Sequence, residues 1–329
     1  MREVVRRGDA ETRRRGETFL LPASPRPRVT ASRFAVIINA SPGAGDREDV
    51  RKHLEDVFAS ERVEARIALA QTGEEIVNLT RRAVEENCQP VIAGGGDGTI
   101  NAVASVIVDT DRTLGVLPLG TLNHFARDLK IPLDLESAAR VCLEGREAHV
   151  DVGEVNGRVF LNNSSLGLYP NIVRHREKQQ ERLGRGKWPA FVWATLTMLK
   201  RYPFLNVRLS TDDQRLIRRT PFVFIGNNEY QMESLRIGAR SRINEGELSL
   251  YVAHHTGRMG LLRLAFRALF GGLRDEKDFD AVCTKEVWVE THRPKRLRVA
   301  TDGEVTIMTT PLHYRTRPGA LRVLVPVPE

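Results

Sequence analysis

The chain has 329 residues, of which 41% are hydrophobic and 28% charged, a composition that is ordinary for a globular protein and excludes a fibrous or low-complexity chain. The formal charge is +8, and no apolar run approaches the length of a membrane-spanning helix, so we expect a cytoplasmic protein. Three widely separated cysteines without metal-ligand spacing argue against a disulfide framework. A chain of this length is expected to form two domains.

Residues 1–32 are expected to form a disordered basic arm, because this segment is rich in arginine and poor in apolar residues. Residues 1–33 carry nine arginines and four acidic residues. Such an arm can be a solvated tail, or it can be attracted to an anionic membrane surface. No nucleic-acid recognition motif accompanies the charge, so we expect no nucleic-acid partner.

Residues 33–150 alternate between β-strand and α-helix patterns, which predicts a doubly wound α/β domain with a parallel sheet. The helix expected from residue 72 has apolar residues on one face, and Thr72 is placed to cap its start. Strands are expected at 34–40, 63–70, 90–96 and 114–120, with helices at 47–60, 72–87 and 99–108.

From residue 151 to residue 317 the pattern changes to short strands separated by turns, which predicts a β-rich sandwich domain. Asn156 and Gly157 are the two residues of an expected hairpin turn. Two helical segments, near 171–202 and 258–273, mix apolar and basic residues and can either pack on the β domain or contact a membrane. Residues 318–329 are expected to return to the first domain as a strand.

The segment VIAGGGDGTI, residues 91–100, places three glycines at the carboxyl end of a predicted strand. Ligands of open α/β sheets bind beyond such ends, and glycines let the backbone approach a phosphate closely. Asp97 would repel a bare phosphate, but it can bind Mg²⁺, which neutralises phosphate charge. Two more strand-end loops, at 39–45 and 118–129, can face the same crevice. The three loops together predict a nucleotide site.

GGDGT, with the upstream loop from Asn39 to Gly43, the downstream LGT-x-N-x-FAR segment and the late DGE, resembles the diacylglycerol kinase catalytic family. The similarity is strongest to the soluble bacterial lipid kinases, which are related to sphingosine kinases, and it covers residues 33–329. It implies an N-terminal nucleotide domain, a C-terminal β-sandwich, and a cleft between them in which ATP, with Mg²⁺, phosphorylates a lipid hydroxyl. Diacylglycerol is the acceptor expected by default.

The resemblance also implies roles for individual residues. Glu304 matches the family's proton acceptor, and Asp302 is its acidic neighbour. A structural Mg²⁺ is implied at Glu245 through its carboxylate, and at Arg242 and Glu247 through their backbone, in addition to Asp97 at the nucleotide. The residues expected to contact the nucleotide are Asn39, Gly43, Thr72, Gly94, Gly95, Gly96, Asp97, Gly98, Thr99, Ile100, Asn101, Thr121 and Asn123.

The chain departs from the family pattern at His124 and at Glu245, both of which stand where an aspartate is usual. A NAD kinase, which shares the GGDGT loop and a two-domain plan, is retained as an alternative. A nucleotide- and lipid-binding regulatory protein that has lost catalysis is another. The expected partner is a lipid substrate at a membrane surface, and exposed edge strands could pair two copies into a homodimer.

Overall fold

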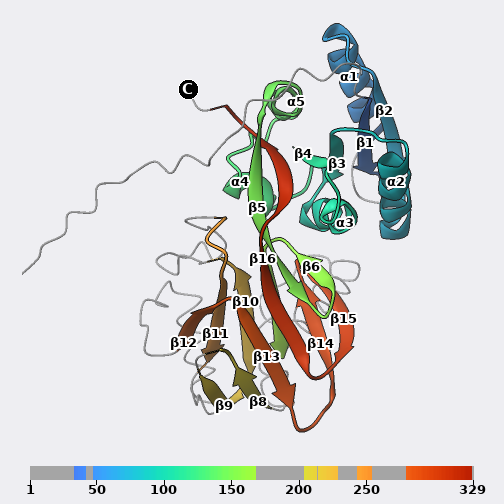
Figure 1. Cartoon of the computed structure of the whole chain (residues 1–329). Helices are drawn as coiled ribbons and strands as arrows, with labels where there is room; N and C mark the ends of the chain where they lie inside the picture. The colour runs from blue at the N-terminus through green and yellow to red at the C-terminus, as the bar shows by residue number, and fades with distance from the viewer. Residues whose placement is uncertain are drawn as a thin grey trace, which may run out of the picture.

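The computed structural model describes residues 33–41, 47–167, 204–212, 214–228, 243–253 and 279–327. Over these residues the chain forms an α/β part and a β-rich part, which lie one above the other in Figure 1. The predicted fold class, a doubly wound α/β domain followed by a β-sandwich, is confirmed. The basic arm and the two predicted helical segments lie outside the described residues.

The α/β part is built on four parallel strands in the order β2-β1-β3-β4. Helix α1 packs against α5, and α2 packs against α3, so that helices cover the sheet. Strands enclosed in this way are buried on both sides, which explains the nearly continuous apolar runs in the sequence. The elements are β1 (Phe34–Asn39), α1 (Arg47–Ser60), β2 (Ala65–Ala70), α2 (Gly73–Glu85), β3 (Val91–Gly95), α3 (Asp97–Ile107), β4 (Thr113–Pro118), α4 (His124–Asp128) and α5 (Leu135–Glu144).

Helix α2 shows how the sequence specifies these elements. The Thr72 hydroxyl accepts a hydrogen bond from the backbone N–H of Glu75 at 3.2 Å, which confirms the predicted cap. Ile76, Thr80 and Ala83 recur at helical spacing and are the buried residues of the helix. The polar positions between them remain on the solvent side.

The β-rich part consists of two packed sheets, of which one is wholly antiparallel and the other continues into the parallel strands of the α/β part. Asn156 and Gly157 form the predicted two-residue turn between β5 and β6, with φ of 47° and 82°. The antiparallel sheet has the order β12-β11-β10-β7-β14-β15. The elements are β5 (Arg146–Val155), β6 (Arg158–Phe160), β7 (Asn163–Gly167), β8 (Leu205–Ser210), β9 (Arg215–Thr220), β10 (Phe222–Asn227), β11 (Leu248–Ala253), β12 (Phe279–Thr284), β13 (Glu286–Thr291), β14 (Arg296–Thr301), β15 (Glu304–Thr309) and β16 (Leu312–Val325).

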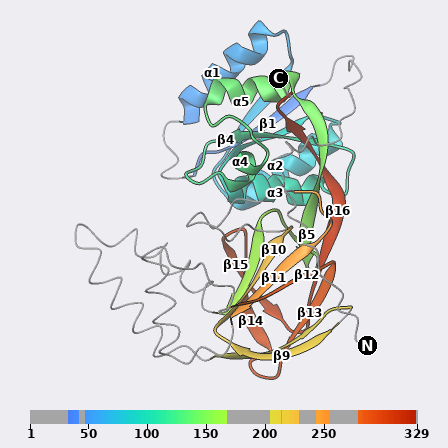
Figure 2. The ribbon, with the colours of Figure 1, turned by 90° about the vertical axis from the view of Figure 1, so that its left-hand side faces the viewer.

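Strands β5 and β16 join the two parts into one continuous sheet, as Figure 1 and Figure 2 both show. Near its end β16 runs parallel to β4, whereas its beginning pairs with β13 of the sandwich. It is antiparallel to β5 along both parts, with a shift of register between Arg317 and Leu321. The parts are thus connected by a two-stranded ribbon in addition to their loops.

Each part has its own hydrophobic core. The first core lies between the parallel sheet and its helices, and the fully buried Leu54 and Phe125 are among its members. The second lies between the two sheets of the sandwich, where Phe160 and Tyr314 make an edge-to-face contact with ring centroids 6.3 Å apart. Among the described helices, none is long and apolar enough to cross a membrane.

Candidate active site

The carboxyl end of β1 is joined to the start of α3, which follows β3, by a contact between two side chains. The side-chain nitrogen Nδ2 of Asn39 donates to the Thr99 hydroxyl at 3.0 Å. The side-chain oxygen Oδ1 of Asn39 accepts from the hydroxyl of Ser41. Thr99 in turn folds onto Gly95, where a Cβ would lie only 2.4 Å from the Thr99 hydroxyl oxygen. Gly95 is therefore required by this packing as well as by any approach of a phosphate.

The loop after β4 packs against the glycine loop, backbone to backbone. A Cβ on Gly120 would lie 2.4 Å from the Cα of Gly96, so the two loops can approach this closely only because residue 120 is glycine. Asn123, in the left-handed region with φ of 51°, organises this loop. Its amide donates to the carbonyls of Pro118 and Gly120, and its carbonyl accepts from the Gly120 N–H.

Asp97, the acid within the glycine loop, links the same two loops. Its carboxylate accepts hydrogen bonds from the backbone N–H groups of His124, at 3.2 Å, and of Phe125, at 3.1 Å. These two groups are at the amino end of α4, where a carboxylate is favoured by the helix dipole. Asp97 therefore holds α4 in place in this structure, and its predicted contact with Mg²⁺ stays a prediction.

Arg47, which sequence analysis missed, reaches the same crevice from the first residue of α1. Its guanidinium donates to the carbonyl of Leu119 at 3.0 Å, next to Gly120. The Nε atom is buried and has no partner among the described residues. Burial lowers the pKa of Arg47 from its ordinary value, because a charged group loses solvation, but arginine remains charged. A partly desolvated cation with a free donor favours an anionic ligand nearby.

The second part of the protein presents an acid to this crevice on a rigid hairpin. Asp302 and Gly303 form the turn between β14 and β15, with φ of 47° and 88°. The carboxylate of Asp302 accepts hydrogen bonds from three consecutive backbone N–H groups, at 2.6, 2.8 and 3.0 Å. They belong to Leu161, Asn162 and Asn163. Asp302 thus anchors the turn, whereas the next acid, Glu304, is exposed.

Glu304 lies across the gap from the amino end of α3. A Cβ placed on Gly98 would be 3.9 Å from the Glu304 Oε1 atom. Helix α3 also packs against β6, so the two parts are in contact beside this point. The other carboxylate oxygen, Oε2, accepts from Arg158 Nη2 at 2.5 Å. Arg158 is a second residue that sequence analysis missed, since nothing in the spacing of β6 indicates its long-range partner.

The remaining residues predicted to contact a nucleotide occupy different environments. Thr72 lies at the carboxyl end of β2, beside β1 in the sheet, and Thr121 is exposed in the loop after β4. Gly94 is buried at the end of β3, and Ile100 belongs to the first core. Asn101 is buried on α3, and its side-chain oxygen has no partner among the described residues. Gly43 lies outside the described residues.

The predicted structural Mg²⁺ site can be examined only in part, because Arg242 lies outside the described residues. The backbone N–H groups of Glu245 and Glu247 donate to Asn228 Oδ1, and the amide nitrogen of Asn228 is buried with no partner among the described residues. An amide nitrogen is a donor rather than a metal ligand. Within the ranges described, no three His, Cys, Asp or Glu side chains cluster to hold a metal. The predicted site needs one carboxylate together with backbone oxygens, so it stays a prediction.

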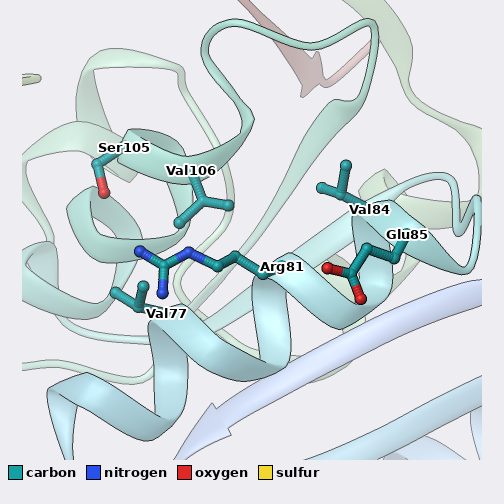
Figure 3. Close-up of a pocket in the computed structure, with 6 residues that line it drawn as sticks. All are labelled: Val77, Arg81, Val84, Glu85, Ser105 and Val106. Atoms are coloured by element: carbon teal, nitrogen blue, oxygen red, sulfur yellow. The ribbon is translucent and has the colours of Figure 1, made fainter.

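A separate hollow of about 570 Å³ lies between α2 and α3. Figure 3 shows the residues that line it, with the Arg81 side chain between Val77 of α2 and Val106 of α3. It lies toward the carboxyl end of α3, whereas the glycine loop is at the amino end of that helix. This hollow is therefore not the crevice in which the predicted residues meet.

Comparison with known proteins bears directly on this arrangement. Residues 33–155 match the diacylglycerol kinase catalytic domain, and residues 171–325 match the YegS C-terminal NAD kinase beta sandwich-like domain. A Pseudomonas aeruginosa protein named "Probable lipid kinase YegS-like" is 30% identical over 256 residues, which are 75% of this chain and 81% of the relative. The chain belongs to the diacylglycerol kinase catalytic family.

Other members of this lipid kinase family extend the similarity over more of the chain. A Klebsiella pneumoniae protein of the same name is 28% identical over 86% of this chain and 94% of its own length. The crystal structure of a diacylglycerol kinase from Bacillus anthracis has a TM-score of 0.63 and 20% identity, and covers 90% of this chain and 97% of that one. This structural similarity supports the fold, with both parts present.

Proposed function

We propose that the chain is an ATP-dependent lipid kinase that transfers the γ-phosphoryl group to the hydroxyl of a diacylglycerol-like acceptor. The observation that carries this proposal is the position of Glu304 Oε1, which faces Gly98 across the gap between the two parts. A nucleotide site and a carboxylate that face each other are the two components that hydroxyl phosphorylation requires.

The triphosphate would lie at the amino end of α3. The first N–H groups of a helix have no partners within the helix, and they point toward an anion placed there. Gly96 and Gly98 leave room for phosphate oxygens, and Arg47 adds a positive charge at the same edge. Asn39, Thr99 and Asn123 act mainly by fixing the loops, because their side chains bond to one another or to nearby backbone.

Transfer then requires removal of the acceptor's proton. Glu304 Oε1 would accept the proton of the lipid hydroxyl as its oxygen forms a bond to the γ-phosphorus. The bond between that phosphorus and the β,γ-bridging oxygen breaks, and ADP leaves with the electron pair. A positioned carboxylate in this role is typically worth about 10²–10⁴-fold in rate. Asp302 contributes by anchoring the turn that carries Glu304.

Mg²⁺ fits this site only as an ion shared with the nucleotide. Mg²⁺ bound with ATP neutralises phosphate charge, and it is usually held by one or two carboxylates, phosphate oxygens and water. Asp97 is the carboxylate of the glycine loop that would hold it, directly or through water, while its oxygens also accept the N–H groups of α4.

The test is incubation with labelled ATP and a total lipid extract, followed by identification of the labelled product. Glu304→Ala should lose transfer while ATP still binds in an equilibrium assay. Glu290→Ala is the matched control, because Glu290 is also an exposed acid of the sandwich that pairs with an arginine. Full turnover by the Glu304 variant would remove this residue from the mechanism.

The same assay distinguishes the alternative functions. Labelled NADP⁺ formed from NAD⁺, with no labelled lipid, would indicate a NAD kinase. ATP binding without transfer to any lipid would indicate a regulatory protein that has lost catalysis. The close approach of Glu304 to the glycine loop favours the lipid kinase over the latter.

A lipid acceptor also requires contact with a membrane surface, so we include peripheral membrane binding in the proposal. Flotation of the full chain with liposomes, with and without anionic lipid, tests this binding. Pairing of edge strands into a homodimer is tested by sedimentation over a range of protein concentrations. A single monomeric species at all concentrations would contradict the dimer.

A further inference from the structure

The ion pair between Arg158 and Glu304 is held by a second bond that fixes the arginine. Arg158 Nη2 donates to Glu304 Oε2 at 2.5 Å, and Arg158 Nε donates to the Thr301 hydroxyl at 2.9 Å. Thr301 is fully buried, and it pairs with Glu304 across the β14–β15 hairpin. The guanidinium is therefore bound to both residues that flank the Asp302–Gly303 turn.

This arrangement gives the two carboxylate oxygens of Glu304 different environments. Oε2 is occupied by Arg158, whereas Oε1 is the atom that faces Gly98. The side chain of Glu304 is 55% exposed, so without a partner it would sample several rotamers. The arginine selects the one in which Oε1 points across the gap.

Stability alone does not account for the pair. Its side chains are 34% and 55% exposed, and exposed ion pairs contribute only about 0–1 kcal/mol to folding. Arg208 and Glu290 form a comparable exposed pair on the same part of the protein. That pair is 3.6 Å long, and within the described ranges Arg208 makes no second bond like the one from Arg158 to Thr301, so the two pairs differ in how firmly the arginine is held.

We propose that Arg158 is a positioning residue that holds Glu304 so that Oε1 receives the acceptor's proton, an inference that rests on the proposed kinase function. Arg158 acts through Glu304 and needs no contact with ATP. Its removal should therefore lower the rate of transfer without weakening nucleotide binding. Removal of Arg158 should also have no effect on the rate when the carboxylate of Glu304 is absent.

Kinetic comparison of variants tests this proposal. Arg158→Ala should lower kcat about 10–100-fold, as expected when a reacting group loses its orientation, with the KM for ATP within about threefold of wild type. Guanidinium ion in the assay should restore part of the rate, and Arg158→Lys should retain an intermediate rate. Thr301→Val, which removes only the acceptor of the Nε bond, should cause a smaller loss. Arg208→Ala is the matched control and should match wild type.

The double variant separates positioning from direct action on phosphate. Arg158→Ala should not further lower the residual rate of Glu304→Ala, measured over long incubations with labelled ATP. Three results would each overturn the proposal. The first is that Arg158→Ala lowers the rate by the same factor in wild type and in Glu304→Ala. The others are a large rise in the KM for ATP, or an unchanged kcat, in Arg158→Ala.

A measurement without catalysis keeps this proposal distinct from the proposed function. The Nε–H resonance of Arg158 in nitrogen-15 spectra should shift in Glu304→Ala and in Thr301→Val. If wild type transfers no phosphate but the resonance shifts, the kinase function fails while the pairing stands. If wild type is active and the resonance does not respond to Glu304→Ala, the positioning role fails alone.

Discussion

Glu304 of the β-sandwich faces Gly98 of the α/β domain, with Oε1 3.9 Å from the position that a Cβ on Gly98 would occupy. The two residues are far apart in the sequence and lie in parts of the protein that have separate hydrophobic cores. Their approach brings the two parts of the protein together at the amino end of α3.

Gly98→Ala should reduce transfer without harming the fold. At 3.9 Å the new methyl group makes an ordinary contact, and alanine within a helix is about 0.5–1 kcal/mol more favourable than glycine. The methyl group would nevertheless occupy the space between the glycine loop and Glu304, where the reacting groups must meet. Chemical denaturation should show equal or greater stability, and the kinase assay should show a large loss. Full activity would place the reaction elsewhere.

Gly95→Ala serves as the contrasting substitution in the same loop. Its Cβ would lie 2.4 Å from the Thr99 hydroxyl oxygen, so Thr99 must move and lose its bond from Asn39. Overpacking of this kind typically costs about 1–3 kcal/mol. Urea denaturation should show this loss, and a stability equal to that of wild type would contradict the packing described here.

Asp97→Ala should destabilise the protein even without nucleotide or metal. The substitution removes the carboxylate that accepts the N–H groups of His124 and Phe125. Loss of a helix cap costs about 0.5–2 kcal/mol. Denaturation in the presence of EDTA measures this structural effect alone. If stability is unchanged under those conditions, the role of Asp97 is confined to its predicted metal contact.

Arg47→Met should weaken ATP binding and leave the chemical step nearly intact. The variant keeps the apolar stem but removes the partly buried cation beside Leu119. We expect the KM for ATP to rise by about 10-fold, equivalent to roughly 1.4 kcal/mol, with kcat within about twofold. Arg51→Met, on the same helix in an exposed pair with Glu48, is the control. Unchanged ATP affinity in the Arg47 variant would exclude this contact.

Asp302→Ala should be more destabilising than Glu304→Ala, although the two acids are close in the sequence. The Asp302 carboxylate accepts three backbone N–H groups, and losing such charge-assisted bonds is expected to cost about 2–4 kcal/mol. Glu304 is exposed and makes one ion pair. Comparison of the urea midpoints of the two variants tests this difference, and equal midpoints would contradict the anchoring role of Asp302.

Local patterns were sufficient to predict much of the fold. The Thr72 cap, the Asn156–Gly157 turn and the glycine-rich end of β3 depend on residues near one another in the chain, so their sequence signals are direct. The family resemblance added Glu304, whose own neighbourhood resembles any solvated turn.

Contacts between residues that are distant in the chain could not be predicted from the sequence. Asn123 and Asp97 were expected to face a nucleotide or metal. In the structure, the Asn123 side chain bonds to the backbone of its own loop, and the Asp97 side chain bonds to the backbone at the amino end of α4. The pairing of Arg158 with Glu304 joins residues 146 positions apart, and only tertiary packing brings them together. The residue types predicted polar contacts near the glycine loop, but they did not indicate which group each side chain would bond to.

The ribbon formed by β5 and β16 constrains how the enzyme can admit its substrates. Because both strands run from one hydrophobic core to the other, the two parts cannot move apart like rigid bodies joined by a flexible linker. Widening the gap must flex paired backbone, most easily at the irregular register between Arg317 and Leu321. The separation between Glu304 and the glycine loop therefore depends on how far this paired ribbon bends.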